Sequence, residues 1–258
     1  MAGVWDLTIN LVASVLAAVA AWVLQRVLAY RRLARTRAFF GVRQGSPSLL
    51  TVGRHWSSPR THSVHRNDVA AIVELGAVVK ECGGRADVVP GAEAPRELGK
   101  MAEFCVGGPD SNPRTAAHLA ALLPGVRVAR YEDAGAEVPI TVGEVAYGHD
   151  PDKVVHVLLA RAVPTAHPVF LLVGQTSLAN LAAARYLAAH HGELRRRYGS
   201  RQPFCLVLRV VKPKSYGPDL VELVADVTEA AFGPAPEQPP ALPRRRAPLR
   251  RRATDTPA

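Results

Sequence analysis

Two short polar segments combine glycines with hydroxyl and amide side chains, a composition suited to holding an anionic small molecule. The first segment, Gly107-Gly108-Pro109-Asp110-Ser111-Asn112, follows the apolar run Phe104–Val106 and precedes Pro113. Glycine lets a ligand approach the backbone closely, and hydroxyl or amide groups donate hydrogen bonds to phosphate or ribose. We therefore predict that this segment and the residues after it bind the ligand through Gly107, Gly108, Ser111, Asn112 and Thr115.

The second segment, Gly174-Gln175-Thr176-Ser177, follows the apolar run Val169–Val173 and precedes an Ala-rich stretch over 178–194 that includes Asn180. It extends the predicted ligand-binding set by Gly174, Gln175, Thr176 and Ser177. Ser, Thr, Asn and Asp are also the residues that commonly cap helices. A turn followed by a helix cap is therefore the simpler interpretation of each segment, and both interpretations stay open.

A third polar segment, residues 53–68, carries three arginines and three histidines. Its arginines Arg54, Arg60 and Arg66 could clamp an anion, and we place Arg54 in the ligand-binding set. A histidine can act as a general base, for which His55 is the first candidate and His62 and His65 are alternatives. No metal site is predicted, because no carboxylate or cysteine ligand accompanies the His62/His65 pair. A surface loop without a specific role explains the same residues.

Asp110 and Glu144 are the carboxylates that we would assign to acid/base roles if the protein cleaves a glycosidic bond, as in hydrolysis of NAD or a nucleoside. Most carboxylates in loops are solvated or cap a helix. The chain lacks GxSxG, GxGxxG and GxxxxGK[ST]. Catalytic activity and cofactor identity therefore stay undecided.

Strands and helices alternate along the central part of the chain. Apolar or alternating segments predict strands at 48–53, 86–89, 104–106, 126–131, 140–145, 154–160, 169–173 and 204–211. A helix capped by Asn67 or Asp68 is predicted to end at Gly83-Gly84, with Val69, Ile72, Val73, Val78 and Val79 on its apolar face. The order predicts an α/β fold, a three-layer domain with a mostly parallel sheet. Its two strand–loop–helix units resemble those of nucleotide-handling Rossmann-like domains, without their glycine fingerprint.

In such a sheet the loops at 53–68, 107–112 and 174–177 leave the carboxyl ends of their strands at the same edge. Open α/β sheets bind ligands in the crevice at this edge, where helix N-termini present unpaired N–H groups. We therefore expect the three loops to meet in one crevice. Their convergence is the main functional inference from the sequence.

Residues 7–24 carry no charge, and Arg26, Arg31, Arg32, Arg35 and Arg37 follow them. The length approaches the roughly 20 residues that a bilayer core requires, and the arginines stay in the cytoplasm by the positive-inside rule. We predict a single-pass anchor in the cell membrane, with the N-terminus outside and the following domain in the cytoplasm. A buried amphipathic helix and a cleaved signal peptide are the alternatives. The predicted parts are an anchor (1–30), a basic juxtamembrane segment (31–43), the α/β domain (44–232) and a disordered Pro/Arg-rich tail (233–258).

The net charge of +10 and the pI of about 10.1 come from the flanks of the chain. Residues 1–43 carry +5, residues 233–258 carry +4, and residues 44–232 carry only +1. A DNA-binding face would need basic residues clustered on the fold, so no specific DNA binding is expected. The Arg-rich flanks could contact anionic lipid. RNA binding or a solvated tail without a partner explains the C-terminal arginines equally well, and a stop-transfer signal explains those after the apolar run. The three cysteines have no paired spacing, which favours a reducing compartment, and the Ala, Arg, Val and Pro content is typical of high-GC bacteria.

Three functions remain for such a chain. The first is a membrane-anchored sensor or regulatory module whose cytoplasmic domain binds a nucleotide-like or other anionic small molecule. The second is a hydrolase or glycosidase of the same fold, acting on NAD or a nucleoside. The third is a non-catalytic membrane scaffold.

Overall fold

The computed structural model describes residues 2–55, 58, 60, 63–95, 97–129, 139–150 and 152–235. The helices are α1 (Ala2–Phe40), α2 (Arg66–Glu81), η1 (Gly91–Glu93), α3 (Pro113–Leu122), α5 (Ser177–Tyr198), α6 (Pro213–Tyr216) and α7 (Thr228–Phe232). The strands are β1 (Pro47–Val52), β2 (Arg85–Pro90), β3 (Glu103–Val106), β4 (Val126–Val128), β5 (Ile140–Val142), β6 (Val145–Tyr147), β7 (Val154–Ala162), β8 (Val169–Gly174), β9 (Phe204–Val211) and β10 (Val221–Asp226). His62 and the tail beyond residue 235 lie outside the described residues.

The main sheet is mixed, so the prediction of a mostly parallel sheet is only partly right. Its seven strands lie in the order β10-β9-β7-β8-β3-β1-β2. The pairs β1/β2, β1/β3 and β3/β8 are parallel, whereas β7 is antiparallel to both β8 and β9, and β10 is antiparallel to β9. Only residues 163–168 join β7 to β8. A parallel connection needs a dozen or more residues, so this short link forces a hairpin.

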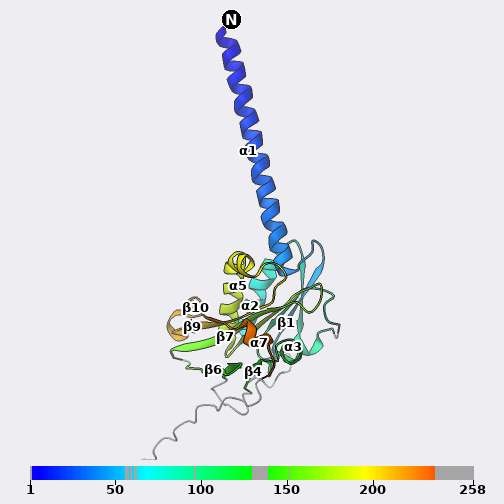
Figure 1. The fold of residues 1–258 in the computed structure, drawn as a ribbon, viewed down its shortest axis with the longest axis vertical. Helices are drawn as coiled ribbons and strands as arrows, with labels where there is room; N and C mark the ends of the chain where they lie inside the picture. The colour runs from blue at the N-terminus through cyan, green and yellow to red at the C-terminus, as the bar shows by residue number, and fades with distance from the viewer. Residues whose placement is uncertain are drawn as a thin grey trace, which may run out of the picture.

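Two apolar cores cover the two faces of the main sheet, which gives the predicted three layers (Figure 1). On one face, α2, α5 and the end of α1 pack on side chains such as Leu50, Phe104 and Phe170. On the other face, α3, α7 and a small antiparallel sheet, β4-β5-β6, pack on side chains such as Cys105 and Leu171. The strands predicted at 126–131 and 140–145 are present as β4 and β5, which pair antiparallel.

Helix α2 confirms the predicted helix but not its cap or its whole apolar face. His65 is the N-cap, and its Nδ1 accepts from Asn67 N at 3.1 Å. Asp68 therefore lies in the first turn with its side chain buried. Val69 and Val73 are exposed, because the helix packs through Ala71, Ile72, Leu75, Val78 and Val79 instead. The helix ends before Gly83, whose φ of +76° only glycine adopts easily.

Helix α1 is continuous from Ala2 to Phe40 and projects from the domain (Figure 1). Within its segment Ser14–Phe40, the most apolar stretch of 18 residues has a mean hydropathy of 1.2 and is not buried, so this helix is long and apolar enough to cross a membrane. The helix also includes residues 31–40 of the predicted juxtamembrane segment. Its last residues, Phe39 and Phe40, are fully buried in the core of the domain, so core-forming residues begin before the predicted boundary at residue 44.

Arg161 on β7 fastens the end of α1 to the domain. Its side chain is fully buried, and the guanidinium carbon lies 4.5 Å from the ring centroid of Phe39 and 5.1 Å from that of Phe204. The guanidinium donates to the carbonyl oxygens of Phe39 (3.5 Å), Gly199 (3.1 Å) and Gln202. Burial lowers the pKa of Arg161 to about 10. One side chain thus joins the ends of α1 and α5 to the sheet.

Candidate functional site

A cavity of about 370 Å³ lies at the carboxyl edge of β1, β3 and β8, where the three predicted loops meet. We call it the crevice. Its volume is near the lower end of the roughly 300–1,000 Å³ of small-ligand sites, which suits a compact ligand. The residues that line it are Arg54, His55, His65, Asp68, Gly108, Pro109, Asp110, Ser111, Val128, Ala129, Gly174, Thr176, Ser177 and Asn180.

Backbone hydrogen bonds fix the loops at 53–68 and 107–112 to each other. Gly53 N donates to Val106 O at 3.1 Å, and Arg54 N donates to Ser111 O at 2.9 Å. A Cβ on Gly53 would lie 2.5 Å from Ser111 Oγ, so this close approach requires a glycine. At Gly108 a Cβ would meet no atom within 4 Å, which leaves its backbone open to a ligand.

Asp68 and Asn180 connect the loop at 53–68 to the loop at 174–177 inside the crevice. Asn180 Nδ2 donates to Asp68 Oδ1 at 2.8 Å, and Asn180 Oδ1 accepts from Gly174 N at 2.7 Å. Both side chains are buried, with exposed fractions of 7% for Asp68 and 3% for Asn180. Burial raises the pKa of Asp68, and the hydrogen bond from Asn180 partly opposes this. The second oxygen of Asp68 accepts no hydrogen bond from the described residues, so it is available to a ligand hydroxyl.

His65 lies between Asp68 and His55, and its ring centroid is 5.2 Å from that of His55. Burial lowers its pKa, as do the charges of His55 and Arg66, while Asp68 opposes the change. The neutral ring accepts from Asn67 N through Nδ1, so its proton resides on Nε2. His65 therefore offers the crevice a hydrogen-bond donor rather than a base.

Helices α3 and α5 both begin at the crevice. Of the three polar residues before Pro113, Asn112 is the one that caps α3, by accepting from Arg114 N and Thr115 N. Thr176 caps α5 by accepting from Ala179 N at 3.3 Å. The N-terminus of a helix carries partial positive charge, so two such ends favour an anion in this cavity.

The structure brings most of the predicted site residues to the crevice. Those that line it are Arg54, His55, Gly108, Asp110, Ser111, Gly174, Thr176 and Ser177. Their ligand-binding and catalytic roles stay predictions.

Five predicted residues do not line the crevice: Gly107, Asn112, Thr115, Gln175 and Glu144. Asn112 is fully buried and donates to Thr51 Oγ1 at 3.2 Å and Val106 O at 3.0 Å. Gln175 accepts from His156 N and donates to Tyr147 O. Both amides therefore hold strands and loops together. Thr115 is buried within α3.

Glu144 is exposed in the turn after β5. There it lies at the opposite end of the small sheet from Val128, because Val126 pairs with Val142 and Val128 pairs with Ile140. Gly107 packs its backbone on β8, with its N donating to Leu172 O at 3.0 Å.

Asp68 and Asn180 are the residues whose role here the sequence did not reveal. Asp68 reads as a helix cap because it opens an amphipathic helix, and Asn180 reads as one polar residue in an Ala-rich helix. They meet across 112 positions of the chain, so no local pattern signals the contact.

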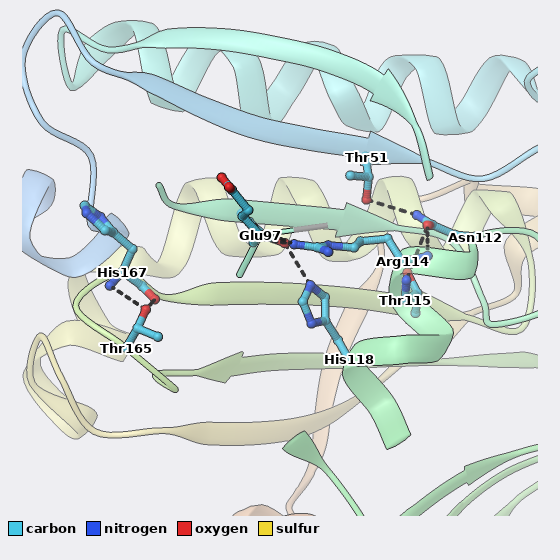
Figure 2. A network of polar contacts seen from close by, with 9 residues as sticks. Thr51, Glu97, Asn112, Arg114, Thr115, His118, Thr165 and His167 are labelled. Atoms are coloured by element: carbon cyan, nitrogen blue, oxygen red, sulfur yellow. Dashed lines mark hydrogen bonds and ion pairs between the residues drawn. The ribbon is translucent and has the colours of Figure 1, made fainter. Parts of the chain in front are cut away.

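A buried ionic cluster, formed by Glu103, Arg114 and His118, lies against α3 near the amino end of β3 (Figure 2). Arg114 donates to both carboxylate oxygens of Glu103, at 2.7 and 3.0 Å, and His118 Nε2 lies 2.8 Å from Oε2. Burial alone would raise the pKa of Glu103, but these hydrogen bonds together lower it. Arg114 also donates to Glu97 O, which ties the segment before β3 to α3.

Ligand atoms of Glu103, His118 and Cys105 lie within 4.8 Å of one another, as in a metal site. However, Arg114 and His118 already engage both oxygens of Glu103. Burial raises the pKa of Cys105 to about 12, so its thiol stays neutral. The cluster is therefore built as a structural ion pair.

No protein-family model matches the sequence, and no curated protein shows significant similarity to it.

Proposed function

We propose that the crevice binds a small phosphorylated sugar, such as a mononucleotide or a pentose phosphate, in a sensor or regulatory domain held at the cytoplasmic face of the cell membrane by α1. The observation that carries the proposal is that one cavity combines a buried acceptor, Asp68, with two helix N-termini and Arg54. The phosphate of such a ligand needs the helix N-termini and the positive charge, and its sugar hydroxyls need the acceptor.

The phosphate half is best placed at the start of α3 and α5. Gly108, Ser111 and Ser177 line this side of the cavity, and backbone N–H groups at helix N-termini suit phosphate oxygens. Arg54 is exposed at the rim and supplies a positive charge. A dinucleotide is disfavoured because the cavity is only about 370 Å³.

The sugar half is best placed at Asp68 and His65. The open oxygen of Asp68 accepts a hydrogen bond from a sugar hydroxyl, and His65 donates one through Nε2. Asn180 fixes the carboxylate beforehand, so less conformational entropy is lost when the ligand binds.

A hydrolase is the second candidate, and the buried carboxylate favours it. Burial raises the pKa of Asp68, a feature found at catalytic acids and at residues that stabilise an oxocarbenium-like centre. We rank binding first because the acceptor nitrogen of His65 is already engaged by Asn67 N.

The ligand proposal is tested by thermal unfolding of the full-length chain in detergent micelles with AMP, ribose 5-phosphate, adenosine and inorganic phosphate. AMP or ribose 5-phosphate at about 100 times its dissociation constant should add roughly 2.7 kcal/mol to the free energy of unfolding. Adenosine and phosphate, which each supply only one half, should add less. Turnover of AMP during the same incubation separates enzyme from sensor.

Arg54→Gln should weaken this stabilisation, whereas Arg85→Gln should not, because Arg85 is exposed on the edge strand β2 outside the cavity. Equal shifts in both variants, or none with any compound in the wild type, would remove the crevice proposal.

The anchor proposal is tested by extracting membranes with high salt and then with alkaline carbonate. The full chain should stay in the membrane pellet through both washes, and a chain lacking residues 1–30 should be released. Retention of the shortened chain would show that α1 is not the anchor. The orientation is read by protease treatment of intact spheroplasts, which should leave the α/β domain uncut.

A further inference from the structure

A second cavity, of about 410 Å³, lies where α1 joins the domain, and we call it the junction cavity. Three segments line it: residues 37–43 at the end of α1, residues 163–168 between β7 and β8, and residues 200–201 after α5. It lies at the opposite end of β8 from the crevice, since Pro168 precedes the strand and Gly174 ends it. In Figure 2, Thr165 and His167 lie at this end and Asn112 at the other.

The charged side chains that line the junction cavity are all cationic. They are Arg37, Arg43 and Arg201, and His167 adds an imidazole. Arg43 and Arg201 are exposed and form no ion pair with any described residue. Arg37 donates through Nε to Cys82 O at 2.7 Å, which fixes its side chain at the cavity wall. The cavity therefore carries positive charge that the described part of the domain does not neutralise.

The carboxyl ends of α1 and α5 bring partial negative charge to the same place, which would oppose an anion. Arg161 offsets this effect, because it donates to the carbonyl oxygens of Phe39 and Gly199 at these two ends. It contacts carbonyl oxygens and no carboxylate among the described residues, so its charge adds to that of the arginines at the cavity.

Hydroxyl groups complete the lining. Ser200 and Thr165 contribute them to the same wall, and Thr165 Oγ1 lies 3.5 Å from the carbonyl oxygens of Gly99 and His167. His167 donates its Nδ1 proton to Gly41 O at 3.2 Å, which fixes its ring at the wall. Arginine forks and hydroxyls are the groups that bind phosphate oxygens in proteins.

The position of the junction cavity along α1 points to the source of the phosphate. Arg31 follows the predicted anchor (1–30), and Arg37 lies six residues further, about 9 Å along the axis. The interfacial layer of a bilayer is about 5–8 Å thick on each side. A chain anchored through α1, as proposed above, therefore holds this cavity beside the lipid headgroups.

We propose that the junction cavity binds the phosphate of an anionic phospholipid headgroup in the leaflet next to the domain. Arg43 and Arg201 supply the charge, and Ser200 and Arg37 supply further hydrogen-bond donors. The proposal rests on the anchoring by α1 and is independent of the ligand in the crevice. It assigns a specific lipid contact to the folded domain, in addition to the general attraction of Arg31, Arg32 and Arg35 for anionic lipid.

The test uses the full-length chain in nanodiscs of phosphatidylcholine alone or mixed with phosphatidylglycerol, with native mass spectrometry of the lipid that the protein retains. The wild type should retain phosphatidylglycerol and unfold at a higher temperature in the mixed discs. The double variant Arg43→Gln/Arg201→Gln should bind it about 30-fold more weakly, which corresponds to about 2 kcal/mol for two arginines near the surface. Lys212→Gln is the matched control, because Lys212 is exposed beyond the far end of β9.

Several results would overturn the assignment. If the double variant retains the lipid as the wild type does, Arg31–Arg35 hold it and the cavity does not. If soluble glycerol phosphate displaces the lipid at concentrations comparable to its own, the cavity is a site for free phosphate compounds. If the wild type unfolds at the same temperature in both kinds of disc and retains no phosphatidylglycerol, no anionic lipid is bound.

Two further measurements distinguish these outcomes from unfolding of the double variant and from failure of the anchor. Should the double variant unfold, Arg43→Lys/Arg201→Lys keeps the charge and should retain phosphatidylglycerol; loss of the lipid from a folded Lys variant would count against a site based on charge. Carbonate extraction is run on the same preparations. Release of the chain there would refute the anchor itself, whereas a retained chain without lipid preference refutes only the cavity.

Discussion

Asp68 illustrates how burial of one carboxylate in the crevice carries a cost in stability. Its folded pKa is raised, so the folded state binds a proton more readily than the unfolded chain, whose Asp titrates near 4. The contribution of Asp68 to stability is therefore most favourable in acid and declines as the pH rises through the folded pKa. Asn180 reduces this loss without removing it, because it donates to only one oxygen.

We predict that Asp68→Asn raises the free energy of unfolding at pH 7 by on the order of 1 kcal/mol, because the buried charge is removed while Oδ1 still accepts from Asn180. The gain should vanish near pH 4. Urea unfolding at both pH values measures it. Asp110→Asn is the control, since Asp110 lines the same cavity but is only half-buried. A variant less stable than the wild type at pH 7 would mean that the contact with Asn180 outweighs burial.

The buried ionic cluster should behave in the opposite way. The folded pKa of Glu103 is lowered, so its stabilising effect is present above about pH 4.3 and is lost as the pH falls through the folded pKa. Arg114→Leu should cost about 3–5 kcal/mol at pH 7, because it leaves a buried carboxylate without its main partner.

The pH dependence identifies the cause of this loss. In Arg114→Leu, burial should raise the pKa of Glu103, so the stability of the variant should rise between pH 6 and pH 4 while that of the wild type does not. Double replacement of Arg114 and Glu103 by Leu and Gln should recover part of the loss. Parallel pH profiles for wild type and Arg114→Leu would contradict the assigned ion pair.

At the scale of elements, the turn after α1 decides how the long helix meets the domain. Gly41 has a φ of +66°, and a Cβ there would overlap the ring of Pro168. Gly45 has a similar φ of +73°, but a Cβ there would meet no atom within 4 Å. Substitutions at the two glycines therefore distinguish the cost of backbone strain from the cost of a steric clash.

We predict that Gly45→Ala lowers stability by about 1 kcal/mol, the cost of a left-handed backbone with a Cβ. Gly41→Ala should lose a further 1–3 kcal/mol, because Pro168 must move. For a chain of this size, each kcal/mol shifts the melting temperature by about 2–4 °C, which thermal unfolding resolves. Equal losses in the two variants would show that the turn tolerates a side chain against Pro168.

The elements themselves were largely predictable. The strand–loop–helix units, the Asn112 cap before Pro113 and the helix end at Gly83 depend on neighbouring residues, so local patterns suffice. The direction of β7 was not inferred, although the short link over 163–168 is a usable signal. The exposed Val69 and Val73 could not be foreseen, because α2 packs against α5 as well as the sheet.

At the scale of the whole molecule, the sheet separates two charged sites. The crevice lies at the carboxyl ends of β1, β3 and β8, and the junction cavity lies beside α1 at their amino ends. Helix α5 begins at the first and ends near the second, at Tyr198, and spans about 33 Å. The two cavities are thus separated by the length of this helix.

We predict that a chain starting at residue 34 folds as an independent domain, whereas one starting at residue 44 does not. The shorter chain loses Phe39 and Phe40, and each fully buried Phe contributes about 3–5 kcal/mol out of a total stability of about 5–15 kcal/mol. It also leaves Arg161 without its contacts to Phe39. Circular dichroism should show a cooperative thermal transition only for the longer chain. A cooperative transition in a chain of residues 44–235 would instead support the predicted domain boundary at residue 44.

The sequence by itself determined the apolar helix, the α/β class and the three loops that supply most of the crevice, because hydrophobic periodicity and capping residues act within a few positions of the chain. The tertiary structure alone decided which side chains face the crevice. Asn112 and Gln175 turn inward to bind strands, while Asp68 meets Asn180 across 112 positions. It also decided that Phe39 and Phe40 enter the core around Arg161. Burial and pKa depend on residues distant in the chain, so they exist only once the layers have packed.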